Sequence, residues 1–485
     1  MNAGFTVDAG VLLGGLLLLV GVLASGLAAR ARVPSLLLFI GLGILVADEG
    51  LGLIRFDDAA LAQNIAAVAL VIILFEGGLG TEPAVFRVAG VPAFLLATLG
   101  VVVTAGVVAL GAIVVLGWEA ESAFLLGAVV SSTDAAAVFA ALRSESLPER
   151  TSRILQLESG MNDPVAVLLT VGMVEVWRGD PSPADWVWFL GTQLAVGAVV
   201  GIAVGVLAQR FVVRASSAVS SLGVISLAIA AVSYGAAAVA GGSGFLSVYL
   251  TGVLLAASDR RVRGVIVFHE GLAATAQGVL FLLLGILVFP SEVVDDLPTA
   301  AVVAAVLVLV ARPVAVVASL VWFRIPIRRL AVMSWAGLRG AVPVVLATIP
   351  FTAGHPDGST IFDVAFVVVV LSVAIQAPTV GPLARRLGVE DRNRRPILPV
   401  EIVPVDAHDA DLVEIEVPVG SRVGGSTLAE ASLPGGARVA VIHREGQTIV
   451  PKGSTQILAG DVLLMVIPRD APLADVDQWC ARIES

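Results

Sequence analysis

Charge, lysine and cysteine are all scarce in this chain. Charged residues occupy 14% of its 485 positions, whereas a soluble domain carries about 25%. Apolar residues occupy 58%, which leaves too little polar surface to cover a water-facing protein of this length. The only lysine is Lys452, and the only cysteine, Cys480, has no second cysteine with which to form a disulfide. The composition therefore excludes a soluble enzyme, a nucleic-acid-binding protein and a secreted disulfide-rich domain, and it indicates an integral membrane protein.

Long apolar runs predict where the chain crosses the membrane. A membrane-spanning helix needs about 20 mostly apolar residues, and thirteen segments meet that condition. They are 8–28, 34–53, 61–80, 91–117, 121–142, 152–177, 186–209, 216–240, 243–257, 264–289, 297–322, 327–352 and 361–387. The predicted fold class is an all-α polytopic membrane protein with thirteen transmembrane helices.

Arginine placement predicts how these segments are oriented. The connections after odd-numbered segments carry 14 arginines, and those after even-numbered segments carry only Arg55 and Arg178. Short loops rich in basic residues stay in the cytoplasm. We therefore expect the N-terminus outside and the C-terminus inside the cell membrane. Five more arginines, within 385–395, follow the last segment, as this rule requires.

Residues 401–485 differ in composition from the rest of the chain. They hold 13 acidic and 6 basic residues and short alternating runs such as LVEIEV and ARVAVIH, which are typical of β-strands. We expect a transmembrane domain at 1–390, a polar linker at 391–400 and a small α/β cytoplasmic domain at 401–485.

Polar residues interrupt the fifth apolar segment at mid-depth. Ser131, Ser132, Thr133 and Asp134 follow one another there, and their side chains compete for backbone hydrogen bonds. An opened helix is tolerated in a membrane only where it lines a cavity, and its freed carbonyls can coordinate a cation. The alternative is an intact helix whose hydroxyls bond back to the preceding turn.

The sixth segment carries Glu158, Ser159, Asn162 and Asp163 within two helical turns. Ionisable residues at this depth are costly and usually functional, and a carboxylate there can bind either a proton or a cation. The alternative is that both acids are neutralised by the buried arginines of the eleventh and twelfth segments. Those arginines are Arg312 and Arg339.

The twelfth segment is also interrupted, because Gly337, Gly340 and Pro343 surround Arg339. It lies seven segments after the fifth, and an offset of seven reverses the direction of crossing. Two broken helices at matching places in opposed halves indicate inverted repeats, with the two helices crossing at a midplane site of a secondary transporter.

The sequence does not fix the roles of two further ionisable residues, Glu76 and His269. Glu76 ends the third segment, where it faces either the same cavity or the membrane interface. His269 is expected to be a satisfied polar residue at a helix interface.

Two other function classes fit poorly. An intramembrane aspartyl protease would use Asp134 and Asp163 as a dyad, but neither aspartate lies in a Gly-x-Gly-Asp motif. A cation channel would need repeated carbonyl-lining loops, which the sequence does not contain. We therefore expect a transporter rather than an enzyme, with no cofactor.

The motifs LFEGGL, SSTDAAAVF, LESGMNDPVA, the ARP of the eleventh segment and GLRGAVP together carry a resemblance across residues 1–390. The chain resembles the NhaP-type monovalent cation:proton antiporters of the sodium/proton exchanger superfamily. Many members have proline where this chain has Ala135.

This resemblance implies the roles of the polar residues. Asp163 and Asn162 would carry transport, with Asp163 binding the cation and the proton in turn during electroneutral exchange by alternating access. The monovalent cation would also contact Ser159 and Thr133, with Asp134 and Glu76 nearby. Glu158 and Arg339 would form a structural ion pair, supported by Arg312. Family members are homodimers in the lipid bilayer.

The tail resembles the C-terminal module of potassium-transport regulators, the TrkA-C domain. The positions that match its pattern are Ser421, Gly424, Leu433, Pro434, Pro451, Gly460 and Asp461. This module is usually regulatory, and it binds a small molecule or dimerises. Antiporters with such a tail are typically described as potassium/proton exchangers. The resemblance therefore favours K⁺ as the transported cation, with Na⁺ or Li⁺ as the alternative.

Overall fold

The chain forms two compact units, Met1–Asp391 and Arg392–Ser485. The computed structural model describes residues 8–31, 35–54, 58–81, 83–134, 147–179, 183–214, 222–257, 263–389, 403–405, 410–418, 420–444, 447–468 and 479–480. Two predicted features, the second half of the fifth segment at 135–142 and the linker at 391–400, lie outside these residues.

All regular secondary structure in the described part of the first unit is helical. Its helices are α1 (Asp8–Ala31), α2 (Ser35–Val46), α3 (Ala59–Leu79), α4 (Pro83–Ala97), α5 (Leu99–Gly111), η1 (Ala112–Leu116), α6 (Ala120–Val129), α8 (Glu149–Gly179), α9 (Pro183–Arg214), α10 (Leu222–Val239), α11 (Gly244–Ala256), α12 (Arg263–Leu287), α13 (Pro290–Val306), η4 (Leu307–Ala311), α14 (Arg312–Leu320), η5 (Val321–Phe323), α15 (Ile327–Trp335), α16 (Val342–Ala353), α17 (Gly358–Leu371), η6 (Ser372–Gln376) and α18 (Ala377–Arg386). Each predicted segment overlaps one of these helices or a consecutive group of them.

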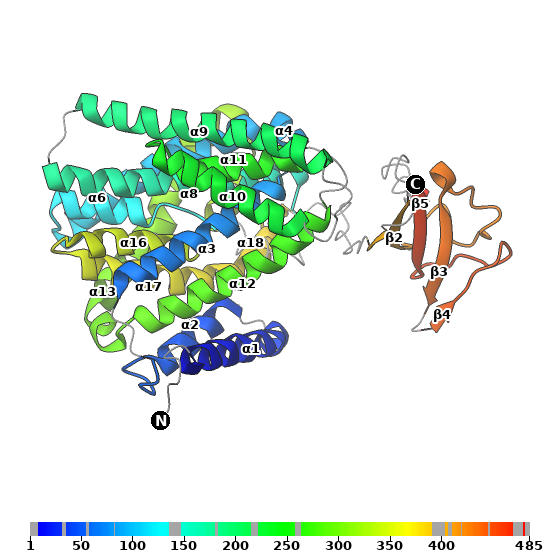
Figure 1. The fold of residues 1–485 in the computed structure, drawn as a ribbon, viewed down its shortest axis with the longest axis horizontal. Helices are drawn as coiled ribbons and strands as arrows, with labels where there is room; N and C mark the ends of the chain where they lie inside the picture. The colour runs from blue at the N-terminus through cyan, green and yellow to red at the C-terminus, as the bar shows by residue number, and fades with distance from the viewer. Residues whose placement is uncertain are drawn as a thin grey trace. The chain divides into compact units, whose positions relative to one another are not determined.

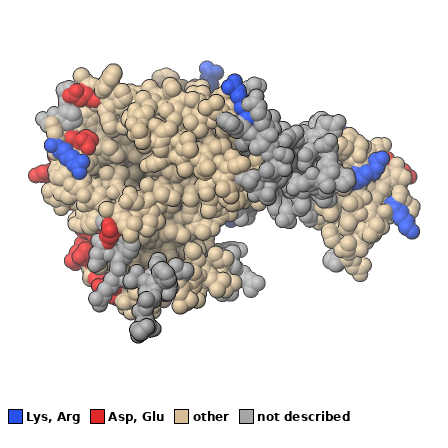
Figure 2. Space-filling view, in the orientation of Figure 1, with Lys and Arg blue, Asp and Glu red and all other residues tan. Residues whose placement is uncertain are grey.

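The surface of this unit suits a lipid environment. Among the described residues, seven helices are long and apolar enough to cross a membrane, and five further apolar helices are shorter. Large apolar side chains such as Val114, Val239 and Trp322 are exposed. Figure 2 shows a broad uncharged face on this unit, with acidic and basic side chains confined to its edges. These features confirm the predicted class of membrane protein.

The helices of this unit are labelled in Figure 1, and their mutual contacts divide them into two bundles. The core bundle contains α4, α5, α6, α8 and the helices from α13 to α18, which pack mainly on one another. The panel bundle contains α1, α2, α3 and the helices from α9 to α12. Helices α3 and α11 of the panel contact α8 and other helices of the core. Within the panel, a side chain at Gly78 of α3 would collide with the backbone of α11, so these two helices pack at close range.

Helical structure stops in the core bundle at both places where the sequence predicts an interruption. Helix α6 ends at Val129, and Ser132, Thr133 and Asp134 have no regular secondary structure. Helix α15 ends at Trp335 and α16 begins only at Val342. The breaks meet, because the backbone N–H of Asp134 donates to the carbonyl of Leu338 at 2.9 Å. The described residues therefore confirm both predicted interruptions, a first break at 130–134 and a second break at 336–341, and these two breaks meet at a crossing.

The second unit contains a five-stranded antiparallel sheet. Its strands are β1 (Val403–Val405), β2 (Ala410–Glu416), β3 (Arg438–Arg444), β4 (Gln447–Ile449) and β5 (Val462–Pro468), in the order β1-β2-β5-β3-β4. The central β5 alternates in burial, so that Leu463, Met465 and Ile467 face the core of this unit. The short helix η7 (Pro434–Gly436) precedes β3.

Candidate functional site

Thr133 lies at the centre of the polar groups of the crossing. Its hydroxyl oxygen accepts a hydrogen bond from Nδ2 of Asn162 at 2.5 Å and lies 3.1 Å from Oγ of Ser159. The same hydroxyl donates to Oε1 of Glu158 over 3.4 Å. Three residues of α8 therefore converge on the first break, because positions 158, 159 and 162 lie on adjacent stripes of one helix face.

Asp163 is the neighbouring carboxylate on α8. Its side chain is 7% exposed, and it interacts with the side chains of Ser132, Asp134 and Arg339. Two buried oxygen atoms of α8, Oδ1 of Asp163 and Oδ1 of Asn162, have no hydrogen-bond partner within the described residues. A buried polar atom left unpaired costs about 1–3 kcal/mol, so a small cation or a proton bound here would stabilise the site.

The ion pair of Glu158 differs from the one that the sequence predicts. Arg312 of α14 donates from Nη1 and Nη2 to the two carboxylate oxygens of Glu158, at 2.5 and 2.8 Å. Both side chains are buried. The expected pair of Glu158 with Arg339 is therefore corrected to a pair with Arg312.

Arg339 is engaged elsewhere, which gives the physical reason for this correction. Its Nη1 donates to the carbonyl of Ser131 at 3.0 Å and to that of Ser132 at 2.6 Å. These carbonyls follow the C-terminal end of α6, which carries a partial negative charge and lacks helical partners. Arg339 therefore satisfies the backbone that the first break exposes.

The second break is held by two polar residues of η6. The backbone N–H of Arg339 donates to Oγ of Ser372 at 2.9 Å, and Ser372 in turn donates to Oε1 of Gln376 at 2.6 Å. The side-chain amide of Gln376 donates to the carbonyl of Trp335, the last residue of α15. Neither residue is predicted from the sequence. Their only signal is two polar residues four positions apart in an otherwise apolar run.

Asp134 connects the two bundles at the crossing. Its Oδ2 accepts a long hydrogen bond, 3.5 Å, from Nε2 of Gln277 on α12. A side chain at Gly340 would collide with the Asp134 carboxylate, so the second break passes directly against this residue. Gln277 was also missed, because one glutamine in a long helix gives no pattern.

Glu76 and His269 lie on the panel bundle. The electrostatic neighbour of Glu76 is Glu270 of α12, and the described contacts of Thr133 do not include Glu76. The His269 ring is buried, with Nε2 lying 2.8 Å from Oγ of Ser226 and the ring packed on Phe75 at 4.8 Å. This arrangement fits the expectation of a polar residue at a helix interface, although Nδ1 has no partner within the described chain.

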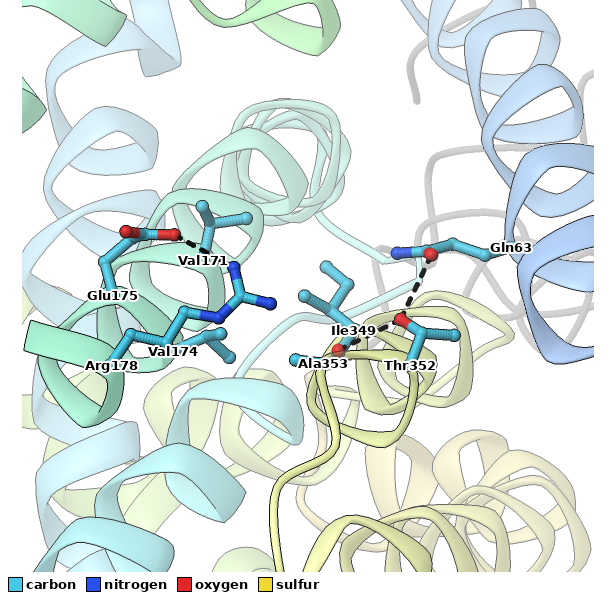
Figure 3. Close-up of a pocket in the computed structure, with 8 residues that line it drawn as sticks. All are labelled: Gln63, Val171, Val174, Glu175, Arg178, Ile349, Thr352 and Ala353. Carbon is cyan, nitrogen blue, oxygen red and sulfur yellow. Dashed lines mark hydrogen bonds and ion pairs between the residues drawn. The ribbon is translucent and has the colours of Figure 1, made fainter.

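A pocket of about 230 Å³ opens further along α8, between α8, α3 and α16. Figure 3 shows Glu175 and Arg178 of α8 on one side of it and Gln63 and Thr352 on the other. Thr352 donates to Gln63 at 3.2 Å, and the Glu175–Arg178 pair spans 3.5 Å. Val174 of the pocket lies 11 residues after Asp163 and therefore on nearly the same face of α8. The pocket thus adjoins both bundles on the side of α8 that carries the carboxylate.

Solved structures share this fold. The sodium proton antiporter MjNhaP1 of Methanocaldococcus jannaschii at pH 8 has a TM-score of 0.67 and 21% identity, covering 78% of this chain and 98% of its own. An electron-microscopy map of the same antiporter gives a TM-score of 0.67 at 20% identity, covering 81% and 100%.

Curated relatives are more similar in sequence. A K(+)/H(+) antiporter NhaP of Alkalimonas amylolytica is 38% identical over 95% of this chain and 82% of its own length. A K(+)/H(+) antiporter NhaP2 of Shewanella baltica is 36% identical over 94% and 80%. A low-affinity Na(+)/H(+) antiporter NhaS1 of Synechocystis is 27% identical over 72% and 68%.

Two family models match the two units. The transmembrane sodium/hydrogen exchanger model matches residues 15–386, and the TrkA-C domain model matches residues 412–478. The first match covers most of the chain and contains both broken helices and all the polar residues of the crossing. The chain belongs to the sodium/hydrogen exchanger family and carries a TrkA-C domain.

Proposed function

We propose that the protein is a secondary transporter that exchanges K⁺ for H⁺ across the cell membrane. One observation carries this proposal: Asp163 is buried beside two crossing helix breaks, and its Oδ1 has no partner among the described residues. The two K(+)/H(+) antiporters that are 36–38% identical to the chain favour potassium. An enzymatic reaction is not part of the proposal, because these relatives are antiporters.

Competition for Asp163 couples the two flows. Either a bound proton or a bound cation neutralises this buried carboxylate, so the two compete for it. Oδ1 of Asn162 and the hydroxyls of Ser159 and Thr133 supply neutral oxygen ligands on the same side of α8. Hard monovalent cations favour such oxygen donors.

The charge of Glu158 is already balanced by Arg312, so Asp163 is the acid that remains for exchange among the α8 residues at the crossing. One carboxylate trades one proton for one monovalent cation. We therefore propose that the exchange is electroneutral.

Alternating access requires that the site open to each side in turn. The core bundle carries Asp163 and both breaks, whereas the panel contacts it mainly through α3 and α11. We propose that the core bundle moves against the panel, with the Gln277–Asp134 contact changing during the motion. The pocket in Figure 3 would then be the mouth of the ion path at the end of α8.

The surroundings of the transport domain are also proposed. We place the exchanger domain at 1–390, the linker at 391–400 and the regulatory domain at 401–485. Arginine placement supports an outer N-terminus and a cytoplasmic tail. The family resemblance supports a homodimer, and the TrkA-C module supports control by a cytosolic small molecule.

Sodium is the second candidate cation. The family model is named for sodium/hydrogen exchange, and the relative from Synechocystis is a Na(+)/H(+) antiporter. Ion selectivity depends on how many oxygens surround the cation and how closely they approach it. Lithium belongs to the same alternative.

The test is exchange by purified protein in liposomes loaded with a pH-sensitive dye. Addition of K⁺ should move protons at lower concentrations than Na⁺ or Li⁺ does, and the steady-state K⁺ gradient should not depend on an imposed membrane potential. Equal or stronger responses to Na⁺ would favour the second candidate. Cation flux without proton movement would identify a channel instead.

A further inference from the structure

An apolar groove lies on the surface of the core bundle. Residues of η4, α14, α15 and α18 line it. It encloses about 330 Å³. Its walls include Leu309, Val317, Ile327, Leu330, Trp335 and Leu383. Leu309 and Ile327 are 65% and 72% exposed, although each is strongly apolar. In a membrane-spanning unit such exposed apolar side chains face the lipid, so the groove is open to acyl chains.

Helices α15 and α18 both line this groove. At one end, Nε1 of Trp335 donates to Oγ1 of Thr379 at 2.9 Å. Leu383 and Arg386 follow Thr379 at helical spacing, so all three lie on one stripe of α18. The stripe therefore starts at Trp335, includes Leu383 in the groove lining and ends at Arg386.

The Ile327 end of the groove is basic. Arg328 follows Ile327 directly, and Arg324 precedes it by three residues. The side chains of Arg324, Arg328 and Arg386 are exposed. Within the described chain, neither Arg328 nor Arg386 has an ion-pair partner. One end of the groove thus carries positive charge that no described acidic residue pairs, and the length of the groove is apolar.

An apolar groove with a basic end is complementary to a phospholipid. Acyl chains fill an apolar groove between helices, and an anionic headgroup binds a basic cluster at the membrane surface. A zwitterionic headgroup carries no net charge and gains less from the same arginines. A second protein chain would also cover the groove, but the exposed arginines at its end favour an anionic component of the membrane itself.

We propose that this groove is a binding site for an anionic phospholipid, with its headgroup phosphate at Arg328 and Arg386. The bound lipid contacts α15, whose last residue, Trp335, is already held by Thr379 and Gln376. Because α15 leads into the break that positions Arg339, the lipid stabilises the half-helix next to the crossing.

The test measures lipid binding, so its result is independent of the transported ion. Purified full-length protein in detergent is titrated with phosphatidylglycerol or with phosphatidylcholine. Native mass spectrometry counts the bound lipids, and the midpoint of thermal unfolding follows the stabilisation. Phosphatidylglycerol should bind and raise the midpoint, whereas phosphatidylcholine should do neither at the same concentration.

Variants locate the site. Arg328→Gln and Arg386→Gln should each weaken phosphatidylglycerol binding about fivefold, and Ala331→Trp should abolish it by filling the groove, since Ala331 is an exposed lining residue. Arg178→Gln removes an exposed arginine of α8 and should leave lipid binding unchanged. Ala331→Trp keeps the charge of the protein, so it still tests the groove if the arginine variants fold poorly.

Three outcomes would overturn the proposal. The first is equal binding of the two lipids by the wild-type protein. The second is unchanged phosphatidylglycerol affinity in the double variant that combines Arg328→Gln with Arg386→Gln. The third is a change from dimer to monomer in Ala331→Trp with lipid binding retained, which would assign the groove to a second copy of the chain.

Discussion

Glu158 and Arg312 form a two-pronged ion pair in the interior of the core bundle, with N···O distances of 2.5 and 2.8 Å. The pair joins α8, which carries Asp163, to α14. It also leaves Arg339 available for the carbonyls of Ser131 and Ser132. The two buried arginines therefore have different roles. Arg312 neutralises a carboxylate, and Arg339 donates hydrogen bonds to backbone carbonyls.

The ion pair predicts a specific coupling between variants. Glu158→Gln should lower the free energy of unfolding by about 3–5 kcal/mol, because it leaves the buried charge of Arg312 unpaired. Adding Arg312→Gln should recover part of that loss, whereas adding Arg339→Gln should not. Thermal unfolding in detergent, together with the yield of folded protein, measures each combination. If Arg339→Gln recovered the lost free energy of unfolding instead, the partner of Glu158 would be Arg339, as the sequence predicts.

Asp163→Asn should abolish exchange and leave a folded protein. The substituted amide keeps the size of the side chain but can neither release a proton nor attract a cation. The matched control is Asp363→Asn on α17, which replaces another buried aspartate that lies outside the crossing and should leave exchange intact. Dye-loaded liposomes with equal amounts of each protein provide the measurement. Wild-type exchange by Asp163→Asn would exclude this carboxylate as the coupling group.

Gly340→Ala should disrupt the crossing. The new methyl group would collide with the Asp134 carboxylate, and overpacking of this kind costs about 1–3 kcal/mol. Gly271→Ala on α12 is the matched control, because a side chain there meets open space. Unfolding midpoints and exchange rates should fall for Gly340→Ala only. Equal behaviour of the two variants would show that the breaks separate easily.

The TrkA-C unit should lose stability in acid through Asp461. Burial raises the pKa of this carboxyl, but hydrogen bonds from Arg444 and from the Leu458 N–H outweigh burial and hold the pKa below its usual value. Both Arg444 contacts measure 2.7 Å. A depressed pKa contributes stability above the ordinary aspartate range, and that contribution is lost as the pH falls through the folded-state value.

Hydrogen exchange of the β5 amides in the full-length protein tests this link. At pH 7 the amides should exchange faster in Asp461→Asn than in the wild type. The difference should shrink as the pH falls from the ordinary pKa of aspartate to the lower folded-state pKa, because the side chain is then protonated in the unfolded state first and finally in the folded state as well. A difference that persists unchanged in acid would show that Asp461 acts through its shape rather than its charge.

Local patterns were enough to predict most of the membrane unit. Apolar length and polar interruptions are properties of short stretches, so the helix positions, both breaks and the polar face of α8 could be predicted from the sequence. The partner of Glu158 could not, because two buried arginines compete for it and only the packed structure shows which one is otherwise engaged. The supporting residues Gln277, Ser372 and Gln376 are single uncharged side chains. Their importance depends on backbone that lies far away in the sequence.

The bond from Arg339 to the carbonyl of Ser132 joins residues 207 positions apart. During synthesis the first break leaves the ribosome long before the arginine that satisfies it. At about 5–20 residues per second, the delay is roughly 10–40 s. Until then the exposed carbonyls depend on water, on helix formation or on the insertion machinery. The ion site is therefore incomplete in the nascent first half of the protein. It is assembled only after the second half has been inserted into the membrane.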